Sequence, residues 1–126
     1  MFTGRVIYAL ALIGFGVYHF MYGPQLATLV PSVLPAQVYM VYLVGVVFIW
    51  AAVTLLLNRG IRPALSVLSA LLMIFIVAIH LKNLLDGNPA LPFLMKDSAL
   101  LGATIFMIGA SYPHPRVEVA TPGEIH

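Results

Sequence analysis

The chain contains no cysteine and very few charged residues. Its 126 residues include six Lys or Arg and four Asp or Glu, which together make up 8% of the sequence. Without cysteine, the chain has no disulfide, no thiolate nucleophile and no ligand for an iron–sulfur cluster. A redox role would therefore need a bound cofactor or a partner protein. The net charge of +2 is not gathered into a basic face, so the composition does not indicate nucleic-acid binding.

Most residues of the chain are apolar. Hydrophobic side chains make up 62% of the sequence, and the mean hydropathy is +1.04. A soluble domain of this size cannot bury so much apolar surface, because most of a small fold lies close to its boundary. We therefore expect a single domain that is embedded in a lipid bilayer.

Four apolar stretches are long enough to cross a bilayer and predict an all-α, four-helix transmembrane bundle. The expected membrane domain covers residues 1–112, and a polar tail follows over residues 113–126. The predicted spans are residues 4–22, 38–57, 61–85 and 98–112. Small and polar residues recur at helical spacing in the last two spans and predict their inward faces. They are Ser66, Ser69, Met73, Val77 and His80 in the third span and Ser98, Gly102 and Gly109 in the fourth.

An even number of spans places both termini on one side of the membrane. Basic residues are more frequent at this end than at the other. They are Arg5, Arg59, Arg62 and Arg116, against Lys82 and Lys96 at the opposite end. The positive-inside rule then predicts cytoplasmic termini.

Polar groups from three spans are expected at the outer end of the bundle. The candidate ligand-binding residues are His19, His80, Asn83, Lys96 and Asp97. Histidine changes its charge near neutral pH, and a nearby carboxylate can hold it as an imidazolium. Such a group can bind an anionic or carbonyl head group, relay protons or ligate a metal. The uncharged loop GPQLATLVPSVLPAQ, at residues 23–37, is expected to fold over the same end.

Structural roles for these residues stay open. The alternative role of His19 is in an aromatic belt with Tyr18 and Tyr22. Lys96 lies where a snorkelling lysine is expected, and Asp97 can cap the fourth helix. The two histidines of the group would also suit the axial positions of a b-type haem, but the site would be shallow. Zinc lacks a third ligand, so no metal site is predicted.

Several segments resemble the DoxX-like membrane proteins. They are GVYHF at the end of the first span, VPSVLP before the second, VYLVGV within it, the turn NRGIRP, and KDSALLGATIFMIG in the fourth. The resemblance covers residues 4–110 and implies a four-helix protein of the bacterial inner membrane. Some members are named as subunits of thiosulfate:quinone oxidoreductase, or as membrane anchors of oxidoreductase and detoxifying assemblies.

The resemblance attaches possible roles to five polar positions. They are Arg5, His19, His80, Lys96 and Asp97. Family members often carry an acid shortly after the glycine of the second span, where this chain has Phe48 in GVVFIW. This departure weakens the transfer of any catalytic role to this chain.

The sequence supports two functions. The first is a non-catalytic subunit or scaffold of a membrane assembly, with other membrane or peripheral subunits, or further copies of the chain, as partners. The alternative is a subunit of a quinone-linked oxidoreductase, which binds a quinone or lipid-like ligand at the outer end through His80 and Asp97. A transporter is less well supported, because the chain has neither an inverted repeat nor a charge in mid-membrane.

Overall fold

The computed structural model describes residues 2–30, 32, 35–113, 115 and 122–123. The described residues form helices and no strand. The helices are α1 (Phe2–Met21), α2 (Gly23–Ala27), α3 (Gln37–Leu57), α4 (Ile61–Ile74), the π-helix η1 (Phe75–Leu81), α5 (Lys82–Leu85) and α6 (Leu91–Ala110). The segments α4, η1 and α5 form one continuous helix, Ile61–Leu85.

Four helices are long and apolar enough to cross a membrane: α1, α3, the continuous helix Ile61–Leu85, and α6. The predicted all-helical architecture with four such helices is therefore confirmed for the described residues. Four helices of this kind indicate a multi-pass membrane protein. The side on which the termini lie stays a prediction, and Arg116, which contributed to it, lies outside the described residues.

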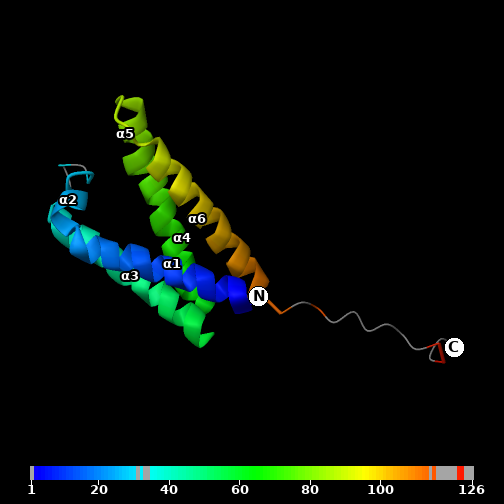
Figure 1. Ribbon diagram of the computed structural model, residues 1–126. Helices are drawn as coiled ribbons and strands as arrows, with labels where there is room; N and C mark the ends of the chain where they lie inside the picture. The colour runs from blue at the N-terminus through cyan, green and yellow to red at the C-terminus, as the bar shows by residue number, and fades with distance from the viewer. Residues whose placement is uncertain (1, 31, 33–34, 114, 116–121, 124–126) are drawn as a thin grey trace.

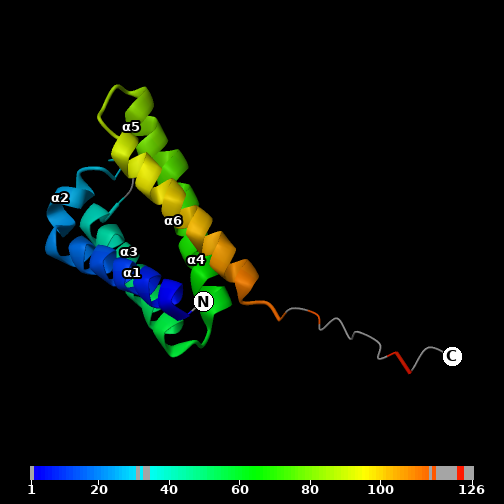
Figure 2. The same cartoon turned by 45° about the vertical axis from the view of Figure 1, so that its right-hand side comes forward.

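The helices are arranged as two pairs (Figures 1 and 2). Helix α1 packs along α3, and the continuous helix Ile61–Leu85 packs along α6. The two pairs meet where α3 turns into α4, close to the start of α1 and the end of α6. From there they diverge toward α2 and α5 (Figure 1). This divergence opens the bundle at the end where the sequence predicts its polar group.

Two glycines allow α1 and α3 to pack closely. A Cβ atom added to Gly16 would lie 2.6 Å from Cδ1 of Ile49 and 3.1 Å from the carbonyl oxygen of Gly45. A Cβ atom added to Gly45 would lie 3.2 Å from the carbonyl oxygen of Gly16. Small residues are typical where membrane helices come this close, since packing drives helix association in lipid.

The inward faces of the last two long helices differ from the prediction. Ser66, Met73 and Val77 are exposed, and the buried residues of α4 are Ala64, Leu65, Leu68 and Leu72. In α6, Ser98, Gly102 and Gly109 are exposed, and the buried residues are Asp97 and Thr104. Leucines therefore form the interior of α4. Two members of the predicted stripe face inward: His80 is buried, and Ser69 is half-buried with its hydroxyl oxygen shielded. His80 lies in η1, where the i→i+5 pattern changes the rotation per residue.

Helix α6 begins earlier than the sequence indicates, at Leu91 rather than at Ser98. Pro92 lies in its first turn, where proline's fixed φ and missing N–H fit a helix start. Asp97 therefore lies in the second turn, about 9 Å along the axis from the helix start at 1.5 Å per residue. The suggested role of Asp97 as an N-terminal cap is wrong.

Candidate functional site

A cavity of about 590 Å³ lies between the two helix pairs, toward the end where they diverge. Both pairs contribute to its wall, and so do Leu26, Leu29 and Val30 from α2 and the loop behind it. The described part of the first loop thus borders the cavity, as the sequence predicts. The volume is typical of a small-molecule site, and most of the lining side chains are apolar.

A buried histidine–aspartate pair forms part of the wall. Nε2 of His80 lies 2.7 Å from Oδ2 of Asp97, and the two residues are only 7% and 1% exposed. An ionised carboxylate can only accept, so we assign the proton of this hydrogen bond to Nε2. The other ring nitrogen, Nδ1, is then the one available to a ligand. This pair joins η1 to α6 across the second helix pair.

Lys96 completes the network. Its Nζ lies 3.2 Å from Oδ1 of Asp97, so both carboxylate oxygens have a partner. The ammonium group also lies 4.7 Å from the ring centroid of Phe15 and 6.0 Å from that of Phe93. A cation over an aromatic face is attracted by the ring quadrupole. Lys96 therefore links α6 to α1 across the cavity.

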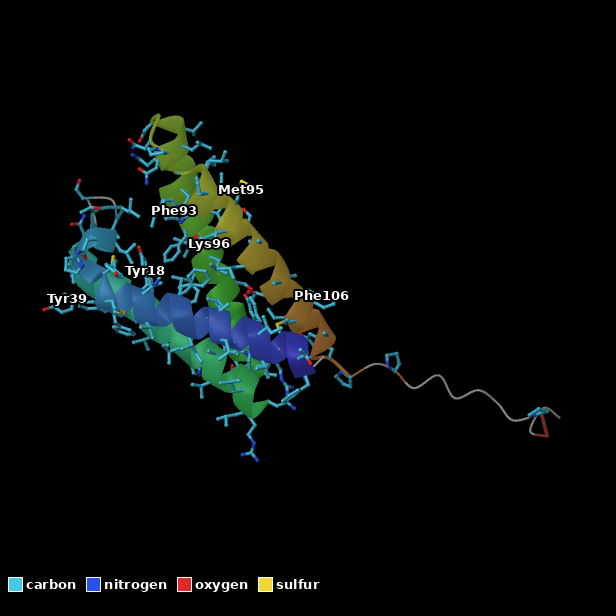
Figure 3. The ribbon with its side chains drawn as sticks, viewed as in Figure 1. Tyr18, Tyr39, Phe93, Met95, Lys96 and Phe106 are labelled. Atoms are coloured by element: carbon cyan, nitrogen blue, oxygen red, sulfur yellow. The ribbon has the colours of Figure 1, made fainter. Side chains whose placement is uncertain are left out.

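Figure 3 shows this arrangement from the side. Phe93 and Lys96 extend from α6 toward α1, on the side where Tyr18 lies, whereas Met95 and Phe106 point away from the bundle. The ring of Phe93 stacks on that of His80, with centroids 5.8 Å apart and an interplanar angle of 15°. Aromatic rings thus surround the polar network on its cavity side.

His19 approaches the cavity from α1. Its Nδ1 lies 2.7 Å from the carbonyl oxygen of Phe15, and because a carbonyl only accepts, Nδ1 carries the proton. In the neutral ring, Nε2 is then an acceptor that can meet a ligand. The imidazole lies 5.3 Å from the ring centroid of Phe48, which also lines the cavity. Among the residues that the structure describes, Asp97 is the one carboxylate in the wall.

Sequence reasoning missed the π-helix η1. It contains His80, and wide π turns inside α-helices occur frequently at functional sites. The apolar run FIVAIHL carries no proline, glycine or change of periodicity that would have signalled it. The aromatic partners of Lys96 were missed as well, because they become its neighbours only when α1 and α6 are packed.

Four of the five predicted site residues line this one cavity: His19, His80, Lys96 and Asp97. Asn83 does not line it. Its side-chain oxygen accepts a hydrogen bond from Nδ2 of Asn88 at 3.5 Å, and its carbonyl oxygen accepts from the Asn88 N–H at 2.9 Å. Asn83 therefore stabilises the turn after α5. The binding role of the other four stays a prediction.

In the part of the chain that the structure describes, no three His, Cys, Asp or Glu side chains come close enough to hold a metal ion.

The comparison with protein families assigns the chain to a family. A family model described as a domain of unknown function, DUF8561, matches residues 8–108. The chain belongs to this family. The match runs from the second turn of α1 almost to the end of α6 and so includes the whole cavity. No curated protein and no solved structure matched the chain. The family description carries no activity, and the likeness to DoxX-like proteins remains a resemblance of sequence segments.

Proposed function

We propose that this member of the DUF8561 family is a multi-pass membrane protein that binds a small amphipathic molecule, of the quinone or lipid-like type, between its helix pairs. The observation that carries the proposal is the network of His80, Asp97 and Lys96 in the wall of an apolar cavity. Ionisable groups on membrane-length helices are costly and commonly mark a functional site. In the predicted topology, the protein lies in the bacterial inner membrane and serves as a subunit of a larger assembly.

The donors and acceptors of the wall match the head group of a quinone. Lys96 keeps N–H donors for a carbonyl oxygen, because Asp97 uses only part of its capacity. Nδ1 of His80 and Nε2 of His19 can accept from a hydroxyl group, as a reduced quinone would offer. The rings of Phe15 and Phe93 can stack on an aromatic head group. The apolar part of the wall would take the tail.

A quinone-linked redox subunit would use the same cavity. A bound quinone would supply the electron chemistry, and the electrons would come from a partner, since the chain has no cysteine. The chain itself would exchange protons through His80, which Asp97 orients. A scaffold, in contrast, needs no bound molecule and would use outward faces such as that of Trp50, which is 43% exposed.

Native mass spectrometry of the protein in a mild detergent tests the proposal. We expect wild-type protein to retain a quinone or lipid-like molecule, whose mass identifies it. Gly14 lines the cavity, and a Cβ atom added there meets no atom within 4 Å. The Gly14→Phe variant should therefore fill the cavity without disturbing the helix contacts and release the molecule.

Gly102→Phe is the matched control. Gly102 is exposed on α6 and outside the cavity, and a Cβ atom there also meets no neighbour within 4 Å. This variant should retain the molecule as wild type does. Equal retention by both phenylalanine variants, or a folded wild type without any bound molecule, would refute the proposal. A protein partner that is lost in Trp50→Ala would then favour the scaffold.

A further inference from the structure

A second cavity, of about 620 Å³, lies at the other end of the bundle, where the helix pairs meet. All four long helices reach it: the first turn of α1, Asn58 at the end of α3, the first turn of α4, and the last turn of α6 with Ser111 behind it. Two arginines, Arg5 and Arg62, are part of its lining. It shares no lining residue with the cavity between the helix pairs, so the two are separate sites.

Contacts within the protein hold both arginines at this cavity. Nη1 of Arg5 donates a hydrogen bond to Oδ1 of Asn58 at 2.7 Å. Nε of Arg5 is buried and has no hydrogen-bond partner among the described residues. The guanidinium carbon of Arg62 lies 4.5 Å from the ring centroid of Tyr112. Each guanidinium group has five N–H donors, so most of these donors are left for a ligand.

The described carboxylates lie far from these arginines. Asp86 and Asp97 are both at the opposite end of the bundle, where their oxygens pair with His80, Lys82 and Lys96. Within the described ranges, then, no ion pair neutralises an arginine. The other two acids of the chain, at positions 118 and 124, fall outside these ranges. A cavity with two such guanidinium groups favours an anion, and the planar fork of arginine fits the oxygens of a phosphate group.

We propose that this cavity binds a phosphate group, with Arg5 and Arg62 as its cationic ligands. Asn58 adds a neutral donor, because its Oδ1 is engaged by Arg5 and its amide nitrogen is left for a ligand. The phosphate belongs either to the head group of an anionic phospholipid or to a small soluble molecule. In the predicted topology this end faces the cytoplasmic leaflet, where basic pockets between helices bind anionic head groups.

The lipid source is tested with single-charge variants. Arg5→Gln and Arg62→Gln each remove one positive charge from the lining of the cavity. Arg59→Gln removes the same charge from an exposed residue of the neighbouring turn that does not line it. Each protein is placed in nanodiscs of equal parts phosphatidylglycerol and phosphatidylcholine, and the lipids retained after release are counted by native mass spectrometry. We expect the preference for phosphatidylglycerol to fall about tenfold in both cavity variants, and to be unchanged in Arg59→Gln.

The soluble source is tested without anionic lipid. The protein is held in a neutral detergent, and its melting temperature is compared in inorganic phosphate and in chloride of the same ionic strength. A phosphate-specific increase that Arg62→Gln abolishes assigns the site to a soluble phosphate. A phosphatidylglycerol preference alone assigns it to a head group. The lipid experiment depends on the membrane placement proposed above, whereas the phosphate experiment does not.

One outcome overturns the proposal: cavity variants that behave like Arg59→Gln in both experiments. The arginines would then act only as surface charges. Arg5→Gln also loses the hydrogen bond to Asn58, so this variant can fail to fold for a structural reason. Arg62→Gln leaves that hydrogen bond intact and decides the question in that case.

Discussion

The buried pair of His80 and Asp97 should stabilise the fold by an amount that a double-mutant cycle can measure. The two single variants are His80→Phe, which keeps a ring against Phe93, and Asp97→Leu, which keeps the branched shape of the side chain. Neither new side chain can form the hydrogen bond, so each single variant removes the same interaction by replacing one of its two partners. The coupling free energy reports the pair itself rather than the cost of each replacement.

The surroundings of the pair determine how large a coupling free energy we expect. A hydrogen bond to a charged group contributes about 1.5–3 kcal/mol, whereas interhelical hydrogen bonds in membrane proteins average about 0.6 kcal/mol. Asp97 lies between Nε2 of His80 and the ammonium group of Lys96, so we compare its hydrogen bond with the charge-assisted class. We therefore expect a coupling of about 2 kcal/mol. The double variant should be less destabilised than the sum of the single variants, because the hydrogen bond between His80 and Asp97 can be lost only once. Lys96 loses its carboxylate partner in the single Asp97 variant and in the double variant alike, so this cost cancels in the cycle.

The assay is reversible unfolding in mixed micelles, with helix content as the signal. The exposed pair of Lys82 and Asp86 is an internal control. Nζ of Lys82 lies 3.1 Å from Oδ2 of Asp86, but the two side chains are 66% and 54% exposed. The Lys82→Met and Asp86→Leu cycle should give a coupling below about 0.5 kcal/mol. Equal couplings for the two pairs, or additive single variants at His80 and Asp97, would refute the reasoning.

Three further variants test the packing and the cavity. Gly16→Ala should lower the free energy of unfolding by about 1–3 kcal/mol, because the added methyl group meets the side chain of Ile49 at 2.6 Å. Tyr8→Phe should cost about 1 kcal/mol in the same assay, because its hydroxyl group donates to the carbonyl oxygen of Leu100 at 3.0 Å. Phe93→Leu should reduce the amount of retained ligand severalfold in native mass spectra, because the ring that stacks on His80 is lost.

Each of these variants has a matched control on an outward face. Gly102→Ala adds a methyl group where no atom lies within 4 Å, so it should not destabilise the protein. Tyr39→Phe removes a hydroxyl group from a side chain that is 74% exposed. Met95→Leu changes a residue that points away from the cavity (Figure 3). If a variant and its control behave alike, the contact assigned to that variant does not contribute as described.

The composition and the apolar runs were sufficient to predict the helical class and the number of long helices. A run of about 20 apolar residues has few ways to satisfy its backbone other than a helix. The gathering of polar residues at one end of the bundle could also be predicted, because His19 and His80 come late in outgoing spans and Lys96 and Asp97 come at the start of the returning one. The start of α6 could not, because Leu91 to Met95 lack a polar N-cap and read as part of the preceding loop.

The inward faces of α4 and α6 and the contacts of the site were decided only by the tertiary structure. In lipid, the outer surface of a bundle is as apolar as its interior, so hydrophobic periodicity does not distinguish the two. The small residues of α6 are outside and the leucines of α4 are inside, which the sequence pattern does not reveal. The pairing of His80 with Asp97 depends on the π turns of η1, and the position of Lys96 over Phe15 depends on how α6 packs beside α1. Sequence alone thus determined which residues reach this end of the bundle, and packing decided which of them touch.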